Sequence, residues 1–215
     1  MFLSQAEADA IDAQISRLES RTGVQVVSAV VGKSDSYAEL PWKAFALGAS
    51  LAGIAIVLVD ARWPHWVTAH TALFHATTVL GAALACALAA IAMPPFARLF
   101  LNEARRDLEV RQHAQSLFLT RELFKTRART GVLIFVSLFE RRVEILPDTG
   151  FRTRVSDPEW QSVISRMTPQ LAAGRAFNAV QDGLAALEDL LESHGFRPDD
   201  EPNELPDRPI EERGA

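Results

Sequence analysis

Apolar residues run almost without interruption through two stretches near the middle of the chain, Ala44–Val59 and Leu73–Met93. As helices rising ~1.5 Å per residue, they would be roughly 24 and 31 Å long, close to the ~30 Å hydrocarbon core of a bilayer. The pattern therefore predicts a two-helix transmembrane hairpin over residues 42–93. A buried helix pair in a soluble protein is the alternative interpretation of the same pattern.

Aromatic and basic residues flank both stretches, which is typical of segments at a membrane–water interface. The predicted interface residues are Trp42, Lys43, Arg62, Trp63, Trp66, Arg98, Arg105 and Arg106. Most of the positive charge lies outside the hairpin, so the positive-inside rule predicts a cytoplasmic location for the soluble part and both termini. The first residues also lack the basic and apolar regions of a secretory signal peptide.

Before the hairpin, the pattern of apolar and polar positions predicts one helix and one strand. Ser4 and Glu7 have the spacing of a capping box, and the amphipathic helix that follows ends near Gly23. The β-branched run Val24–Val31 is typical of a strand buried on both faces.

After the hairpin, the pattern predicts a long helix over residues 96–126 and then two strands, Gly131–Phe139 and Arg142–Pro147. Two helices follow, the first of which should end at Pro169 and Gly174. Residues 197–215 are rich in Pro, Asp and Glu, which predicts a disordered acidic tail.

Together these elements predict an α/β (α+β) fold, a small mixed sheet covered by helices and interrupted by the hairpin. Residues 1–41 and 94–196 would form one domain, because the strand Val24–Val31 needs partner strands that come after the hairpin. The first two strands should be parallel, since a helix separates them, and the second and third should form a β-hairpin.

Composition narrows the possible functions. A net charge of −5 argues against general nucleic-acid binding. The single cysteine, Cys86, excludes an intrachain disulfide. The sequence contains no nucleophile elbow, P-loop, dinucleotide-binding glycine pattern or zinc-protease motif.

Four carboxylates are the candidates for a metal site: Asp35, Glu140, Asp148 and Asp157. If the first two strands are parallel, Asp35 and Glu140 lie at the same end of the sheet, where ligands bind in open α/β sheets. Their oxygens would suit Ca²⁺ or Mg²⁺. Ordinary turn and helix-start chemistry explains the same residues without a metal.

The chain resembles the TPM-domain family, in particular a bacterial branch with a two-span hairpin inside the domain. The residues that carry the resemblance are Arg129–Ser137, Glu140–Ile145, Asp148–Phe151 and Trp160, with the loop Ser34–Tyr37 and the tail residues Asn203–Asp207. The resemblance implies another small membrane protein, such as a LemA-type protein, as a partner. Some family members are described as acid phosphatases or calcium binders. Where many carry an acidic Gly-Asp-Tyr-like sequence, this chain has Gly174-Arg175-Ala176-Phe177, which argues against an inherited site.

Three functional hypotheses follow, and the third is a lipid-surface sensor that uses the basic helix after Pro95. The first is a non-catalytic interaction module anchored in a bacterial cytoplasmic membrane, with the lipid bilayer and another membrane protein as partners. The second is a divalent-metal-dependent phosphatase-like hydrolase that uses Asp35 and Glu140.

Overall fold

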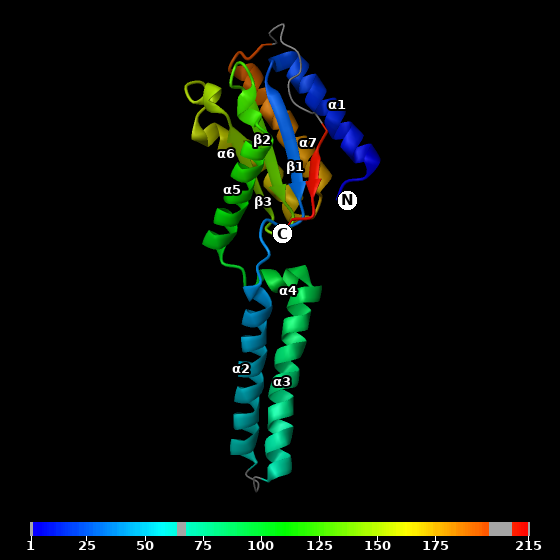
Figure 1. Cartoon of the computed structure of the whole chain (residues 1–215), viewed down its shortest axis with the longest axis vertical. Coiled ribbons are helices and arrows are strands. Elements are labelled where there is room, and N and C mark those ends of the chain that lie inside the picture. Colours follow the sequence, from blue (N-terminus) through cyan, green and yellow to red (C-terminus); the bar gives the residue numbers. More distant parts are fainter. Residues whose placement is uncertain (1, 64–67, 198–207, 215) are drawn as a thin grey trace. The chain divides into compact units, whose positions relative to one another are not determined.

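The computed structural model describes residues 2–63, 68–197 and 208–214, which form two compact units (Figure 1). One unit combines the residues up to Ser36 with those from Ala104 onward, and the other comprises Tyr37–Glu103. The first unit is therefore built from two separate parts of the chain. The interrupted mixed α+β fold expected from the sequence is confirmed.

A mixed sheet with the strand order β3-β2-β1-β4 forms the centre of the first unit. Its strands are β1 (Gln25–Val31), β2 (Gly131–Ser137), β3 (Arg142–Pro147) and β4 (Ile210–Glu212). β1 and β2 are parallel and β2 and β3 antiparallel, as predicted. Every residue of β2 is buried, which fits its continuous apolar run.

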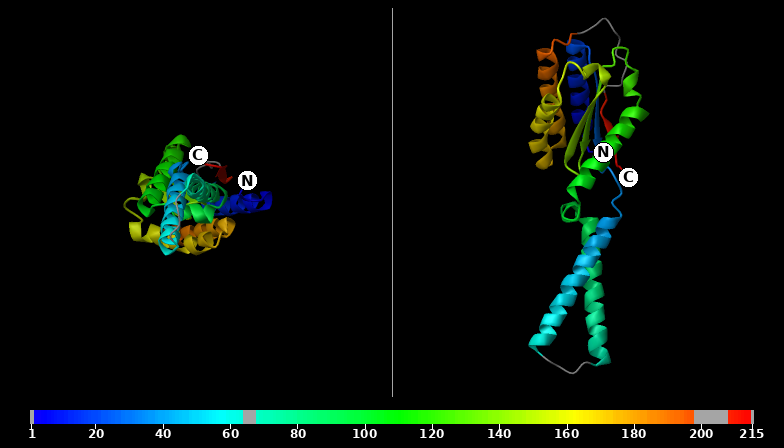
Figure 2. Two further views of the ribbon diagram at one scale, coloured as in Figure 1. Left: turned by 90° about the horizontal axis from the view of Figure 1, so that it is seen from below. Right: turned by 90° about the vertical axis from the view of Figure 1, so that its left-hand side faces the viewer.

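Helices cover both faces of this sheet (Figure 2, right). On one face lie α1 (Gln5–Thr22), α6 (Asp157–Ala172) and α7 (Ala176–Ser193), and on the other lies α5 (Glu103–Thr120). Alternate residues of a strand point to opposite faces, so Val26 and Val30 pack with the first group, and Val27 and Ala29 with α5. The α1 capping box is present, since the Ser4 hydroxyl accepts from Glu7 N–H and the Glu7 carboxylate accepts from Ser4 N–H.

The chain does not end in a wholly disordered tail, and the prediction for residues 197–215 is wrong at Ile210–Glu212. These residues form β4, which pairs in parallel with β1 from Ala29 to Val31. Without a partner strand, this edge of β1 would expose backbone N–H and C=O groups. The three residues of β4 pair with part of the edge. The resemblance at Asn203–Asp207 lies outside the described residues.

The predicted helix over residues 96–126 is not continuous. A short helix α4 (Pro94–Arg98) is followed by a turn, then by α5 and the 3₁₀ turn η1 (Leu123–Lys125). Leu99 N–H donates to the Phe96 carbonyl and Leu101 N–H to the Arg98 carbonyl, so the spacing is that of a tight turn. Three consecutive apolar residues at 99–101 also do not continue an amphipathic stripe.

Pro169 does not end its helix as predicted, because α6 continues to Ala172. The proline lies in the last turn, where the loss of one N–H leaves most of the helix unaffected. The end comes at Gly174, whose φ of 76° is in the left-handed region. A second 3₁₀ turn, η2 (Thr149–Phe151), connects β3 to the loop before α6.

The second unit contains α2 (Glu39–Arg62) and α3 (Ala69–Ala92), both long and apolar enough to cross a membrane. They pack closely at Gly48, where an added Cβ would lie 2.7 Å from the Ala82 carbonyl oxygen. Trp42 and Trp63 are exposed, and Trp66 lies outside the described residues.

Candidate functional site

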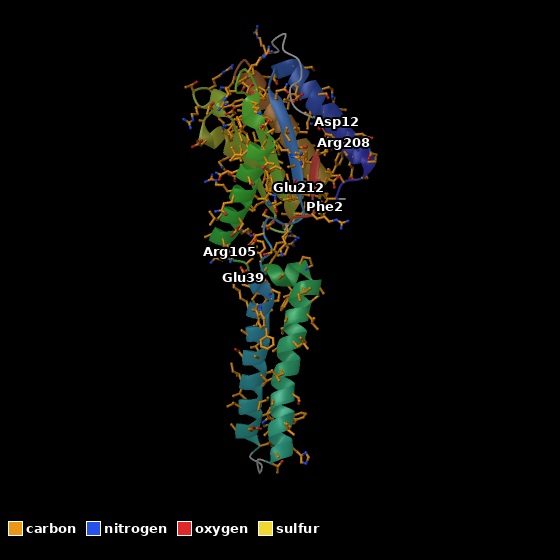
Figure 3. The ribbon with its side chains drawn as sticks, viewed as in Figure 1. Phe2, Asp12, Glu39, Arg105, Arg208 and Glu212 are labelled. Atoms are coloured by element: carbon orange, nitrogen blue, oxygen red, sulfur yellow. The ribbon has the colours of Figure 1, made fainter. Side chains whose placement is uncertain are left out.

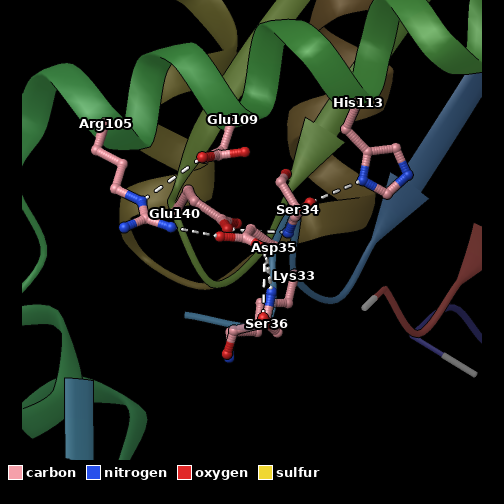
Figure 4. Close-up of polar contacts among 8 residues, drawn as sticks. All are labelled: Lys33, Ser34, Asp35, Ser36, Arg105, Glu109, His113 and Glu140. Carbon is pink, nitrogen blue, oxygen red and sulfur yellow. Dashed lines mark hydrogen bonds and ion pairs between the residues drawn. The ribbon is translucent and has the colours of Figure 1, made fainter. Parts of the chain in front are cut away.

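The carboxyl ends of β1 and β2 meet at one end of the sheet and bring two loops together. The loop after β1 runs beside the turn between β2 and β3. Leu138 N–H donates to the Val31 carbonyl over 3.0 Å, and Phe139 N–H donates to the Gly32 carbonyl over 3.0 Å. The loop of Lys33–Ser36 is thereby held against the turn that carries Glu140 (Figure 4).

Glu140 is the centre of a buried polar cluster in these loops. Its side chain is 1% exposed. One carboxylate oxygen accepts from Ser34 N–H over 2.9 Å, and the other accepts from the Ser137 hydroxyl. The Ser34 and Ser137 hydroxyls also pair, over 3.0 Å. A buried carboxylate is stable only when hydrogen-bonded in this way, so the cluster fixes the loop after β1.

Asp35 lies beside this cluster in an ion-paired arrangement with α5 (Figure 4). One Asp35 oxygen is 3.0 Å from Arg105 Nη2, and the other accepts from Ser36 N–H over 2.7 Å. Arg105 also lies 3.5 Å from the Glu109 carboxylate, one helical turn along α5. This chain of charges links the loop after β1 to α5.

His113 joins the same loop to the C-terminal strand. Its Nδ1 is 3.2 Å from the Ser34 carbonyl oxygen, and its Nε2 is 3.5 Å from the Glu212 carboxylate. Glu212 and Phe2 are near each other in the first unit (Figure 3). The neighbouring Glu211 carboxylate accepts from Phe2 N–H, so both ends of the described chain are tied to this region.

The chemistry of the cluster is that of a fixed loop. The Ser34 hydroxyl donates to the Ser137 hydroxyl, which in turn donates to Glu140, whereas His113 contacts the Ser34 carbonyl and not its hydroxyl. A serine nucleophile needs a base on its hydroxyl, and the Ser137 hydroxyl has the Glu140 carboxylate there, but Ser137 is 0% exposed and so is shielded from solvent. Within the residues that the structure describes, no three His, Cys, Asp or Glu side chains gather to hold a metal ion.

The four predicted carboxylates divide into two pairs. Asp35 and Glu140 lie at the same end of the sheet, as expected from the parallel strands. Asp148 N–H donates to the carbonyl of Gly131, the first residue of β2, so Asp148 lies at the opposite end. There Asp148 and Asp157 line one cavity of about 290 Å³. The Asp148 carboxylate is 3.0 Å from Arg129 Nε and accepts from Thr149 N–H over 2.7 Å.

The predicted interface residues fall in both units. In the second, Lys43 Nζ donates to the Phe100 carbonyl over 3.3 Å, and the Arg62 guanidinium lies 5.4 Å from the Trp63 ring. Arg98 belongs to α4. In the first, Arg105 pairs with Asp35, and Arg106 Nε is 3.8 Å from the Asp107 carboxylate.

Sequence reasoning did not find Ser34, Ser137, Glu109 or His113 as members of this cluster. The spacing of Ser137 and Glu140 across a tight turn was a usable signal, as was the i, i+4 spacing of Arg105 and Glu109. No signal in the sequence indicated the contact of His113 with Glu212, because this contact depends on β4.

The fold and site define a class of protein, an α+β domain with a charged loop cluster, interrupted by a long apolar hairpin. Residues 100–190 match the family model described as the TPM domain, which confirms the resemblance drawn from the sequence. Among solved structures, the BA42 protein from the psychrophilic bacterium Bizionia argentinensis is similar, with a TM-score of 0.58 and 16% identity over 98% of this chain and 96% of that one. At that identity the likeness shows the fold alone. No curated protein matches the chain.

Proposed function

We propose that this chain is a membrane-anchored, non-catalytic interaction module of the TPM type in the bacterial cytoplasmic membrane. The observation that carries the proposal is the outer surface of α2 and α3, where large apolar side chains are exposed along both helices. They are Leu47, Leu51, Ile54, Val57, Leu58, Val59, Leu73, Phe74, Leu80, Leu84, Leu88 and Ile91. So much apolar surface is unfavourable in water and favourable in lipid.

The proposed orientation has both termini and the first unit in the cytoplasm. The distribution of Lys and Arg supports it, since Arg62 is the one basic residue near the link between the helices. A cysteine at Thr68, in a Cys86→Ala background, should react in intact cells with a membrane-impermeant thiol reagent. A cysteine at Arg208 should react only after the membrane is opened. The reverse result would invert the orientation.

The proposed partner is another small membrane protein, for which the family resemblance suggests a LemA-type protein. Crosslinking in native membranes followed by mass spectrometry tests this role directly. We expect crosslinks from the first unit to one recurrent membrane protein, at a higher yield than to abundant bystanders. Crosslinks to lipid-exposed bystanders alone would contradict an interaction role.

A divalent-metal-dependent phosphatase is the second candidate. Two observations favour it: Asp35 and Glu140 share one end of the sheet, and the matching family model is named for a phosphatase. Under this hypothesis, the purified protein hydrolyses a phosphomonoester only with Ca²⁺ or Mg²⁺, and Asp35→Asn removes the activity. Calorimetry that detects no binding of either metal, with no hydrolysis above background, would eliminate it.

A further inference from the structure

The outer edge of β3 has no described partner strand in the first unit. β3 is the last strand of the order β3-β2-β1-β4, so no described strand pairs with it on the side away from β2. β1, by contrast, has β4 on its other side. An open edge offers backbone N–H and C=O groups to an added strand.

The hydrogen bonds show which β3 residues face outward. Asp148 N–H donates to Gly131 in β2, and residues of an antiparallel strand alternate between facing the partner and facing away. Counting back in steps of two, Leu146, Glu144 and Arg142 bond to β2. Val143 and Ile145 therefore direct their N–H and C=O groups outward. Pro147 has no N–H, so the open edge is short.

A groove of about 520 Å³ lies beside the first half of this edge, at Arg142, Val143 and Glu144. Leu108 and Val110 of α5 line one side, Ile164 of α6 lines the other, and Val143 of β3 lies between them. Leu108 is 52% exposed and offers an apolar surface that is open to solvent, while polar and charged side chains make up most of the lining. An extended peptide added to this edge would direct alternate side chains toward α5 on one face of the sheet and α6 on the other.

Five charged side chains line the groove, and one positive charge remains once internal pairs are counted. Arg111 Nε is 3.0 Å from the Glu144 carboxylate, and Arg142 Nε is 2.7 Å from the Asp107 carboxylate. Arg111 and Arg142 are neutralised by these pairs, so Arg141 carries the remaining positive charge. Arg141 is exposed at the turn before β3. An occupant with a carboxylate at this end would complement it.

We propose that the β3 edge is the docking site for an extended acidic segment of a partner protein, which adds to the sheet as a fifth strand between α5 and α6. Backbone hydrogen bonds to Val143 and Ile145 hold the segment, and Arg141 fixes its direction by pairing with an acidic side chain. This inference rests on the proposed interaction role and names the surface that serves it.

The test uses the full chain in detergent micelles and an eight-residue probe peptide in which Val and Thr alternate, with two Glu residues at one end. Amide hydrogen exchange measured by NMR should be fast at Val143 and Ile145 in the free protein, and slow at Glu144 and Leu146. With the peptide, Val143 and Ile145 should become protected. Methylating the backbone nitrogens that face β3 should weaken binding by about tenfold or more, since each lost hydrogen bond lowers the affinity.

Arg141→Glu should weaken binding of the probe by about fivefold or more, because it places a like charge beside the glutamates. Arg152→Glu is the matched control, since Arg152 is an exposed arginine outside the groove, and its binding should be unchanged. Slow exchange at Val143 and Ile145 in the free protein would overturn the inference, as would equal binding of the methylated peptide. Native-membrane crosslinks that avoid α5 and α6 would overturn it while leaving the interaction role intact.

Discussion

At the scale of single residues, Glu140 has the clearest physical role. Glu140→Ala would leave the Ser34 N–H without its carboxylate acceptor and would remove a partner of the Ser137 hydroxyl. An unsatisfied buried polar group costs about 1–3 kcal/mol, so we expect the free energy of unfolding of the first unit to fall by about 2–4 kcal/mol. Urea unfolding followed by circular dichroism, with the protein in detergent, measures this change.

The matched control is Glu109→Ala. Glu109 is an i, i+4 partner of Arg105 with a side chain 23% exposed, and such pairs contribute about 0.5 kcal/mol or less. If the two variants had the same stability, Glu140 would not be the residue that fixes the loop after β1.

Glu159 provides a prediction about pH. Hydrogen bonds from the Ser156 backbone N–H, then from its hydroxyl, and then from His194 lower the pKa of Glu159 from 4.5 to about 2. Because the folded-state pKa is depressed, this contribution to stability is present above about pH 4.5 and is lost as the pH falls toward 2. Glu159→Gln should therefore be less stable than wild type at pH 7.

The difference between Glu159→Gln and wild type should shrink between pH 4.5 and 2, as measured by urea unfolding across that range. Glu7→Gln should change with the same sign, because the backbone N–H of Ser4 also lowers the pKa of Glu7. A stability difference for Glu159→Gln that stays constant from pH 7 to 2 would show that the charge of this carboxylate does not contribute to the free energy of unfolding.

The sequence was informative about residues where local pattern determined their place. Parallel pairing of β1 and β2 follows from the helix predicted between two buried strands, so the shared location of Asp35 and Glu140 could be predicted. The sequence alone could not separate Asp148 from Asp35 and Glu140, because the end of the sheet at which Asp148 lies depends on where β3 ends. The ion pair of Arg105 with Asp35 could not be predicted, because charge near an apolar stretch does not reveal its partner.

At the scale of elements, the packing of α2 against α3 depends on Gly48. A Cβ at Gly48 would lie 2.7 Å from the Ala82 carbonyl oxygen, 2.9 Å from Cys86 Sγ and 3.0 Å from Ala83 Cα. Two of these are backbone atoms, so Gly48→Ala should force the helices apart and lower the thermal stability of the hairpin in detergent. Helix loss monitored by circular dichroism reports the effect.

Gly53→Ala is the matched control in the same helix. An added Cβ at Gly53 has no atom within 4 Å, and Ala favours a helix over Gly by about 1 kcal/mol. This variant should be as stable as wild type or more so. If Gly53→Ala lowered the thermal stability more than Gly48→Ala, α2 would not pack on α3 at Gly48.

The elements themselves were predictable where one period dominated. β3 has the predicted bounds, Arg142–Pro147, and α1 buries the predicted positions Ala8, Ile11, Ile15 and Leu18. β4 was missed because three residues next to an acidic, proline-rich segment carry no strand signal of their own. Its formation depends on the open edge of β1, which is a tertiary effect.

At the scale of the whole molecule, the first unit should fold without the second. Its two chain segments meet at the Asp35–Arg105 ion pair, one residue from Ser36 and one from Ala104. A flexible linker of a few Gly and Ser residues can therefore replace Tyr37–Glu103. The linked protein should be soluble without detergent and unfold cooperatively in urea, because β1 and β2 remain paired and both faces of the sheet stay covered.

The fragment from Ala104 onward is the informative comparison, because it retains most of the region that matches the TPM domain but lacks α1 and β1. Without β1, the fully buried strand β2 has an unpaired edge and β4 has no partner strand. The fragment should then be aggregated or lack a cooperative transition. A stable, monomeric fragment would mean that the segment before the hairpin is dispensable. A linked protein that failed to fold would mean that the apolar hairpin contributes to folding of the first unit.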